Sequence, residues 1–462
     1  MHYNPLLDTD SYKASHWLQY PPGTSGMFSY VESRGGEYPA TLFFGLQYIL
    51  KQYLSQPIEV WMVEEAKVFY QAHGEPFNEG GWNYIVRELS GRLPVRIRAV
   101  PEGMVVPNHN VLMTAESTDP HAFWVVSWLE TLLMRVWYPV TVATRSWNVR
   151  QTIYAALQQT ADDPDGEIGF KLHDFGARGV SSRESSGIGG MAHLVNFLGS
   201  DTVQGVLYAN RFYSCNMAGF SIPAAEHSTM TAWGKVGEEE AYRNMVQQFA
   251  KPGVLLAVVS DSYDIWNAVE NLWGSALKQE VIDSGATVVI RPDSGNPVMV
   301  VSRLLKILAD RFGTTTNSKG YKVLKYVRVI QGDGVNPTTI AEVLEAIIKL
   351  GFSAENVAFG MGGALLQQVN RDTQKFAYKC SQVTIDGKDI PVFKNPATDP
   401  GKRSKPGRLD LVRRDGKFIT VALNGERQAP DSKLVTVYEN GQLLKDFTFA
   451  DVRAQAAPCT NA

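Results

Sequence analysis

The chain has 462 residues, of which 44% are hydrophobic and 20% are charged, and this composition argues against a disordered protein. Its length predicts roughly two or three domains. The net charge of −3 gives no basic field that would recruit nucleic acid, and the three widely spaced cysteines indicate neither a disulfide framework nor a thiolate zinc site.

The N-terminal stretch MHYNPLLDTDSYKASH has no basic patch followed by an apolar core, so it is not typical of a signal peptide. Together with the cysteine usage, this favours a cytoplasmic protein. The most apolar window, residues 122–143, is about as long as a membrane span. Because Glu130 and Arg135 lie near its middle and Pro139 follows, we predict a buried helix of a large core and no membrane partner.

Apolar runs alternate with helical patterns from residue 168 onward. The runs that begin these repeats occupy residues 169–179, 253–261, 286–297, 327–335 and 356–363. Continuous apolar strands indicate burial on both faces, and the intervening helices supply the crossovers of a parallel sheet. The interval between repeats, on the order of 30 residues, is typical of a βα unit.

Each of these runs becomes polar at its C-terminal end. The polar positions are His173-Asp174, Ser260-Asp261, Arg291 with Asp293, Gln331 with Asp333, and the glycines of 360–363. In a barrel of parallel strands these ends converge on one face, whereas an open parallel sheet gathers ligands at its carboxyl edge. We favour the barrel because nearly every strand, and not only those at a switch point, ends in polar residues.

The two ends of the chain have a different pattern. Residues 1–150 mix helical and strand patterns, and the chain after about residue 385 is β-like, with Asn440-Gly441 suited to a type I′ hairpin and a loop over 393–410. We therefore predict an α/β barrel over 151–384. Residues 1–150 and 385–462 are predicted to form a second, β-containing domain.

RPDSGNP, residues 291–297, is the stretch that most strongly indicates a sugar-phosphate binding site. Asp293 can bind ribose hydroxyls or Mg²⁺, Arg291 can bind a polar ligand group, and the turn supplies backbone N–H donors. The alternative is a surface turn with a structural ion pair.

Two glycine clusters, QGDG (331–334) and GMGG (360–363), follow strands and precede helices. Glycine lets the backbone approach a phosphate closely, and a helix N-terminus favours the anion. GMGG is not a dinucleotide fingerprint because Leu365 stands where the third glycine would be. Tight barrel turns also explain each cluster, but with Arg371, roughly a helical turn or two further on, a phosphate cup is the better interpretation.

PAAEHSTMTAWG, residues 223–234, leaves the role of His227 open. Zinc binding of the HExxH type fails because residue 231 is Thr. A general base or phosphoryl acceptor would need an orienting carboxylate, which Asp261 could supply, and an ordinary core histidine is the alternative.

KLHDFGARG, residues 171–179, combines an aromatic ring with a guanidinium. Phe175 and Arg178 could stack a flat heterocycle and bind a phosphate, or could be a core residue and a surface residue.

Taken together, these stretches resemble the nicotinamide phosphoribosyltransferase family. The resemblance runs in order from about Asp8 to about Val452, through TDSYKASH, GLQYIL, KLHDFGARGVSS, HLVNFLGSDTV, PAAEHSTMTAWG, VVSDSYDIWN, VIRPDSGNP, VIQGDGV and basic residues near 395–408. It implies transfer of phosphoribose from phosphoribosyl pyrophosphate to nicotinamide, which gives nicotinamide mononucleotide and pyrophosphate. It also implies an irregular parallel α/β barrel of the type II phosphoribosyltransferase kind, in a homodimer with shared active sites.

The resemblance also implies roles for individual residues. Phe175 would stack on one face of the nicotinamide ring, Tyr12 of the other subunit on the opposite face, and Asp201 would accept a hydrogen bond from the carboxamide, with Arg291 nearby. His227 would be phosphorylated by ATP, with Asp261 orienting it. The residues implied to hold the ribose phosphate are Arg178, Asp293, Gly332, Asp333, Gly362, Gly363 and Arg371. Those implied to reach the pyrophosphate or ATP phosphates are Arg34, Lys394 and Lys402. Mg²⁺ would bind through the pyrophosphate, with Asp293 and Asp333 as candidate ligands.

The chain departs from animal members of this family at Ala257, Met361 and Ala177, which bears on the amide contacts and the tunnel lining. Two alternative functions remain. A nicotinate phosphoribosyltransferase would share the fold and much of the phosphate cup, and Asp201 argues for the amide. A barrel lyase acting on sugar phosphates would need a Schiff-base lysine at a strand end, for which Lys171 is the candidate.

Overall fold

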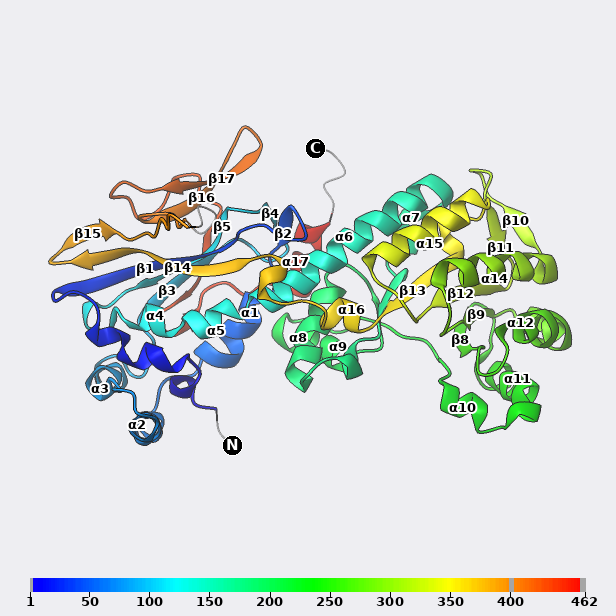
Figure 1. The fold of residues 1–462 in the computed structure, drawn as a ribbon, viewed down its shortest axis with the longest axis horizontal. Coiled ribbons are helices and arrows are strands. Elements are labelled where there is room, and N and C mark those ends of the chain that lie inside the picture. Colours follow the sequence, from blue (N-terminus) through cyan, green and yellow to red (C-terminus); the bar gives the residue numbers. More distant parts are fainter. Residues whose placement is uncertain (1–2, 399–402, 458–462) are drawn as a thin grey trace. The chain divides into compact units, whose positions relative to one another are not determined.

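The computed structural model describes residues 3–398 and 403–457, and these form two compact units. Unit 1 consists of residues up to Thr144, Arg211–Cys215, and the chain from Asn370. Unit 2 consists of Arg145–Asn210 and Asn216–Val369. Both ends of the chain therefore contribute to one unit, and the βα repeats form the other (Figure 1).

Unit 1 is built on an antiparallel sheet of seven strands in the order β15-β14-β1-β5-β3-β18-β19. Their bounds are β1 Thr24–Ser33, β3 Val95–Ala99, β5 Val111–Ser117, β14 Phe376–Ile385, β15 Lys388–Pro391, β18 Val435–Glu439 and β19 Gln442–Leu443. Figure 1 shows β1 and β14 side by side, and they pair from Thr24 with Ile385 to Ser33 with Phe376. The sheet thus joins segments from opposite ends of the sequence.

Two small antiparallel pairs complete the strands of unit 1. β2 (Ala40–Leu42) pairs with β4 (Val105–Pro107), and β16 (Leu409–Arg414) pairs with β17 (Lys417–Ala422). The turn between β18 and β19 confirms the hairpin prediction, because Asn440 and Gly441 have φ of 49° and 81°, as a type I′ turn requires.

Residues 122–143 form a broken series of helices rather than the single helix predicted. The helices are α4 Val125–Trp128, α5 Glu130–Met134 and α6 Trp137–Thr160. At the end of α5 the amides of Arg135 and Val136 donate to carbonyls three residues back, which tightens the turn, and Pro139 lies in the first turn of α6, where its missing N–H costs no hydrogen bond. No helix in the described part of the chain is long and apolar enough to cross a membrane.

The other helices of unit 1 are short or lie near the N-terminus. They are α1 Leu46–Ile49, α2 Val60–His73, α3 Glu79–Glu88 and α17 Phe449–Ala456.

Unit 2 contains a parallel sheet in the order β7-β6-β13-β12-β9-β8. Its strands are β6 Leu172–Asp174, β7 Gly199–Ser200, β8 Leu255–Val259, β9 Thr287–Arg291, β12 Val327–Gln331 and β13 Val357–Met361. Five of these lie inside the apolar runs predicted as strands, and their side chains are largely buried, as the continuous apolar pattern requires.

An irregular segment, residues 220–225, closes the sheet into a barrel. Phe220 forms a parallel bridge with Gly199 of β7, and Ala224 forms one with Ala257 of β8. Backbone hydrogen bonds link Phe220 to Leu198 and Ser200, and Ala225 to Ala257. The two edge strands are therefore joined through this segment, which confirms the irregular parallel α/β barrel.

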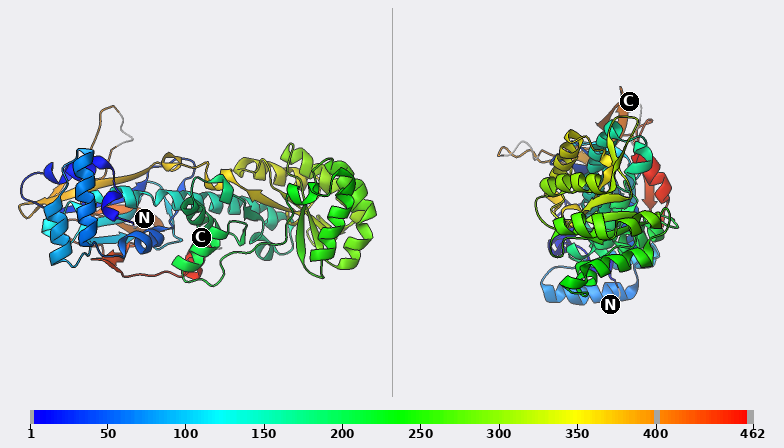
Figure 2. Two further views of the ribbon diagram at one scale, coloured as in Figure 1. Left: turned by 90° about the horizontal axis from the view of Figure 1, so that it is seen from below. Right: turned by 90° about the vertical axis from the view of Figure 1, so that its right-hand side faces the viewer.

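Helices cover the outside of these strands (Figures 1 and 2). α8 (Arg183–Leu194) packs on β7, α11 (Glu238–Phe249) packs on β8, and α14 (Pro297–Phe312) packs on β12 and on α15 (Pro337–Lys349). The remaining elements are α7 Pro164–Ile168, α9 Val203–Phe212, α10 His227–Thr231, α12 Ile265–Asn267, α13 Lys278–Ser284, α16 Gly363–Leu366, β10 Thr314–Thr316 and β11 Lys322–Leu324.

Two of the helical patterns that follow the apolar runs do not form regular α-helices. After β8, residues 262–274 form α12 followed by a π-helix over Ala268–Ala276. After β13 the helix is only α16, because Asn370 caps a new 3₁₀ turn, accepting hydrogen bonds from the amides of Asp372 and Thr373 at 2.8 and 3.1 Å. Arg371 is therefore not on the helix that follows GMGG.

The unit boundaries also differ from the predicted domain limits. The sequence pattern places the barrel over 151–384, whereas unit 2 ends at Val369. At the C-terminal end the difference includes β14, which pairs along its length with β1 in unit 1.

Candidate active site

The carboxyl ends of the barrel strands surround a small apolar layer inside unit 2. Ala257 of β8, Val289 of β9 and Ile330 of β12 form a buried cluster, and Phe175 and Ile222 pack against it. Phe175 thus lies on the inner layer of the barrel, directly after β6.

His227 is the first residue of α10, and a carboxylate holds its ring. Its Nε2 lies 2.9 Å from Asp261 Oδ1, directly after β8, and its Nδ1 lies 3.9 Å from Asp293 Oδ2. Asp261 Oδ2 accepts hydrogen bonds from the Asp293 amide at 3.0 Å and from Ser294 Oγ at 2.6 Å. Burial would raise the pKa of Asp261, but the bonds from Ser294, His227 and the Asp293 amide outweigh it and hold that pKa below its ordinary value.

The RPDSGNP turn continues from this pair toward Phe175. Arg291 is the last residue of β9, and its Nε lies 3.9 Å from Asp293 Oδ1. Gly332, in the loop after β12, lies close to Arg291, Asp293 and the ring of Phe175. A Cβ placed on Gly332 would lie 3.0 Å from Asp293 Oδ1, 3.6 Å from Arg291 Cδ and 3.7 Å from Phe175 Cε2. A side chain at 332 would therefore crowd the polar groups where they meet the ring.

The glycines after β13 face the same aromatic residue. A Cβ on Gly360 would lie 2.0 Å from Phe175 Cε2, so the ring packs on the bare backbone of β13. A Cβ on Gly362 would lie 3.5 Å from the Phe175 carbonyl oxygen, and one on Gly179, beside Arg178, would lie 3.6 Å from the Gly363 amide nitrogen. The structure thus brings together both glycine clusters, the Arg178 turn and Phe175.

Asp201 follows β7 and is exposed, and its amide donates to the carbonyl of Asp174 at 3.0 Å. One of its carboxylate oxygens accepts a hydrogen bond from Ser221 Oγ at 2.6 Å, from the segment that closes the barrel. Asp333 is exposed in the loop after β12. The described residues contain no group of three or more His, Cys, Asp or Glu that could hold a metal ion alone.

The predicted Mg²⁺ site fits the donors that are present. Asp293 and the loop of Asp333 offer carboxylate oxygens, and Mg²⁺ is commonly held by one or two carboxylates together with substrate phosphates. These residues would therefore hold Mg²⁺ only together with the phosphate oxygens of a bound substrate.

The predicted phosphate-binding cations of unit 1 lie around β1 and β14. Arg34 directly follows β1, and its Nε donates to Glu32 Oε1 at 2.7 Å. Lys394 is exposed after β15; its amide donates to Ser404 Oγ at 2.9 Å, and its carbonyl accepts from the Ser404 amide at 3.0 Å. Lys379 of β14 was not singled out from the sequence. Burial first, and the charges of Arg34 and Lys394 to a smaller extent, lower its pKa against the charge of Glu130.

Two further predicted ligand-binding residues of unit 1, Tyr12 and Arg371, are exposed. Tyr12 is 55% exposed in a 3₁₀ helix, Ser11–Leu18, and its ring packs edge-on to His16. Arg371 begins a 3₁₀ turn and is exposed. Lys402 lies outside the described residues.

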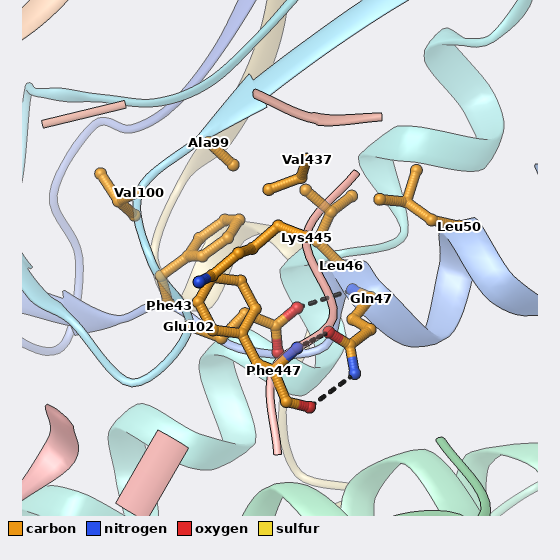
Figure 3. Close-up of a pocket in the computed structure, with 10 residues that line it drawn as sticks. All are labelled: Phe43, Leu46, Gln47, Leu50, Ala99, Val100, Glu102, Val437, Lys445 and Phe447. Carbon is orange, nitrogen blue, oxygen red and sulfur yellow. Dashed lines mark hydrogen bonds between the residues drawn. The ribbon is translucent and has the colours of Figure 1, made fainter. Parts of the chain in front are cut away.

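A separate pocket in unit 1, shown in Figure 3, is lined by a glutamate and a glutamine whose side chains are already hydrogen-bonded within the protein. Glu102 accepts from the amides of Gly45 and Gln47 and from Tyr213 Oη, at 2.9, 2.6 and 2.6 Å. The Gln47 side chain bonds the backbone of Phe447 in both directions. The pocket is therefore a structural joint rather than a ligand site.

Comparison with known proteins gives the family. The model of the nicotinate phosphoribosyltransferase (NAPRTase) family matches residues 170–442, and that of the nicotinamide phosphoribosyltransferase N-terminal domain matches residues 4–97. The nicotinamide phosphoribosyltransferase of Xanthomonas campestris pv. campestris (strain 8004) is 60% identical over 463 residues, which cover 99% of both chains. The chain belongs to the nicotinamide phosphoribosyltransferase family.

More distant comparisons agree. The nicotinamide phosphoribosyltransferase of Acinetobacter baylyi is 30% identical over 98% of this chain and 97% of its own. Two solved structures share the fold: nicotinate-nucleotide pyrophosphorylase from Pyrococcus furiosus (TM-score 0.62, 15% identity, 98% and 94% coverage) and human nicotinic acid phosphoribosyltransferase (TM-score 0.55, 17% identity, 97% and 93% coverage).

The three departures from animal members of the nicotinamide phosphoribosyltransferase family lie close to Phe175. Ala257 belongs to the buried layer on which the ring packs, and the carbonyl of Met361 accepts a hydrogen bond from the Phe175 amide at 3.0 Å. Ala177 is exposed two residues further along the chain.

The structure adds two residues to those that the motifs indicate in this member of the family. Ser294 belongs to the RPDSGNP motif, but its hydrogen bond to Asp261 forms only because β8 and β9 are neighbours in the sheet. Gln374 is fully buried and braces the Arg34 loop by bonding both the amide and the carbonyl of Tyr38, at 2.8 and 3.1 Å. No sequence signal marks it.

Proposed function

We propose that this chain transfers phosphoribose from phosphoribosyl pyrophosphate to nicotinamide, giving nicotinamide mononucleotide and pyrophosphate. The observation that carries the proposal is that Asp293 and Phe175 both lie next to Gly332, so close that a Cβ there would lie 3.0 Å from Asp293 Oδ1 and 3.7 Å from Phe175 Cε2. A carboxylate that can bind the hydroxyls of an activated sugar therefore lies next to an aromatic ring that can stack on a flat base.

The chemistry requires breaking the anomeric C–O bond of the sugar. Positive charge then develops on the ribose, and pyrophosphate leaves with negative charge. Carboxylates at Asp293 and Asp333 would hold the ribose hydroxyls and stabilise that positive charge, and the basic residues would stabilise the leaving group. Mg²⁺, bound with the substrate, would neutralise part of the pyrophosphate charge.

Nicotinamide is a neutral, weak nucleophile, so its orientation matters. Phe175 is fixed on the β13 backbone and would present one face to the pyridine ring, with Tyr12 of a second subunit on the other. Such stacking aims the ring nitrogen at the anomeric carbon in advance of the reaction. The proposal therefore includes a homodimer that shares its active sites.

Asp201 would select the amide over the acid. One of its oxygens is bonded to Ser221, which leaves the other to accept a carboxamide N–H. The carboxylate of nicotinate would meet a like charge instead, at a cost of several kcal/mol, roughly a hundredfold in discrimination.

His227 would couple the reaction to ATP. Asp261 would accept a hydrogen bond from protonated Nε2 of His227. In that tautomer Nδ1 carries the free lone pair. Nδ1 would attack the γ-phosphorus of ATP, forming an N–P bond while the bond to the ADP oxygen breaks and ADP leaves. The added phosphoryl charge would order the nearby phosphate site.

The lyase alternative is disfavoured by the position of Lys171. Burial lowers the pKa of Lys171, as Schiff-base chemistry requires, but the residue precedes β6 and so lies at the amino end of the strand. Its Nζ bonds Glu167 and the Glu355 carbonyl at 2.6 and 2.7 Å, away from the carboxyl ends where ligands bind.

The direct test incubates the purified chain with nicotinamide and phosphoribosyl pyrophosphate, with and without ATP. We expect nicotinamide mononucleotide to form without ATP and to form faster with it. The absence of this product under both conditions would refute the proposed reaction.

A further inference from the structure

Asp174 is a buried carboxylate behind both predicted contacts to the nicotinamide base, and no role has been assigned to it so far. It ends β6, between β13 and β7, where it is paired with Met361 on one side and with Ser200 on the other. Its exposed fraction is 0%, so the carboxylate is entirely removed from solvent.

One oxygen of Asp174 fixes the turn that carries Phe175. Oδ1 accepts a hydrogen bond from the Gly176 amide at 2.7 Å, and a Cβ on Gly176 would lie 3.0 Å from the same oxygen. The amide of Phe175 is meanwhile bonded to the Met361 carbonyl at 3.0 Å. The backbone on both sides of the ring is therefore held, on one side by the Asp174 side chain.

Asp174 also supports the Asp201 loop. Its carbonyl accepts the Asp201 amide at 3.0 Å, and the Thr202 hydroxyl is close enough to its carboxylate to lower the pKa. Neither Asp174 Oδ2 nor Thr202 Oγ1, both buried, has a hydrogen-bond partner among the described residues. Asp174 thus contacts both the Phe175 turn and the Asp201 loop, and its Oδ2 accepts no hydrogen bond from the described residues.

No lysine or arginine among residues 3–398 and 403–457 forms an ion pair with Asp174. Burial first, and the charge of Asp201 to a smaller extent, raise the pKa of Asp174 to about 6, against the hydrogen bond from the Gly176 amide and the nearby Thr202 hydroxyl, which lower it. The surrounding strands contribute Met361 and Ser200, and α8 contributes Gly190, whose Cβ would lie 3.3 Å from Oδ2. None of these is charged.

The two histidines nearby hydrogen-bond to groups other than Asp174. Burial lowers the pKa of His173, which bonds the Phe170 carbonyl, and His193 of α8 bonds Ser146 and the Gly199 carbonyl. Asp201 is therefore the charged group that acts on Asp174, and the two carboxylates repel.

We propose that Asp174 is a positioning and specificity-determining residue of the nicotinamide subsite: it sets the geometry of the Phe175 turn and the Asp201 loop, and its charge reinforces the rejection of an anionic base. This inference rests on the proposed function. When ionised, Asp174 adds a second negative charge behind Asp201, which a neutral amide tolerates and a carboxylate does not. When it is protonated, the discrimination weakens and the geometry remains.

The substitution Asp174→Asn separates charge from shape. The Asn carbonyl can still accept the Gly176 amide, and its NH₂ can donate to the unpaired Thr202 hydroxyl. The substitution Asp174→Ala removes the bond to Gly176 as well. Asp310→Asn, at an exposed aspartate of α14, is a matched control for the loss of one carboxylate.

The experiment measures kcat/KM for nicotinamide and for nicotinate from about pH 5.5 to 8.5 in the full chain and the three variants. We expect the preference for nicotinamide in the unmodified chain to rise as the pH passes about 6, the pKa of Asp174. In Asp174→Asn the rise should disappear, and the preference at neutral pH should fall about three- to tenfold. Asp174→Ala should in addition raise KM for nicotinamide more than it lowers kcat.

An unchanged preference and an unchanged pH profile in Asp174→Asn would overturn the inference. The inference would also be overturned if Asp310→Asn changed the pH profile of the nicotinamide preference as much as Asp174→Asn does. The proposed function fails separately, because the unmodified chain would then form no nicotinamide mononucleotide at any pH.

Discussion

Replacing Asp174 by Asn should make unit 2 more stable, and more so at neutral than at acidic pH. In the folded chain burial raises the pKa of Asp174 from 3.8 to about 6. Because a shift of one pKa unit is worth 1.36 kcal/mol, ionising this residue in the folded state costs about 3 kcal/mol once the pH is well above 6.

The sign follows from proton binding. Between about pH 4 and 6 the folded chain binds more protons at Asp174 than the unfolded chain does, so the free energy of unfolding falls as the pH rises. Roughly half of the total, about 1 to 2 kcal/mol, is lost between about pH 5 and pH 7.5. Asn does not titrate, so the variant should avoid this loss.

The assay compares unfolding of the unmodified chain and Asp174→Asn at those two pH values. For a unit of this size we expect the difference in Tm between variant and unmodified chain to grow by about 3 to 5 °C from the acidic to the neutral pH. The exposed control Asp310→Asn should show no such growth. An equal difference at both pH values would show that no buried charge exists at Asp174, and the electrostatic reasoning would be refuted.

Three further substitutions test the site. Replacing Asp201 by Ser should narrow the gap in kcat/KM between nicotinamide and nicotinate by roughly a hundredfold, and unchanged relative values would exclude its role. Replacing His227 by Ala should abolish stimulation by ATP while leaving a measurable ATP-independent reaction; acid-labile phosphate on the variant chain after incubation with ATP, measured by mass spectrometry, would contradict this. Replacing Ser294 by Ala removes a donor that lowers the pKa of Asp261, so the pKa should rise and ATP stimulation should fail at a higher pH on acidification. Superimposable pH profiles would count against that link.

Much of the barrel and its polar edge follows from periodicity. The carboxyl ends of parallel strands meet on one face, so Asp261 and Asp293 could be placed together from the strand pattern alone. The structure joins them through the Asp293 amide. The same reasoning places Gly332 and Phe175 near each other, and the glycines allow the contact.

Other features depend on packing that a local pattern does not encode. Residues 220–225 close the barrel with isolated bridges, and they have neither the length nor the alternation of a strand. β14 pairs with β1, which lies at the other end of the sequence, so its partner, and with it the position of Lys379, cannot be inferred locally. Asp174 looks like one more polar strand end, yet α8 and the adjacent loops bury it completely.

The most direct test of the central claim is a competition. Equal concentrations of nicotinamide and nicotinate are given to the full chain with limiting phosphoribosyl pyrophosphate, and the two mononucleotides are quantified by mass spectrometry. The account predicts nicotinamide mononucleotide in an excess of about a hundredfold at neutral pH. Comparable amounts of the two products, or an excess of nicotinate mononucleotide, would contradict it.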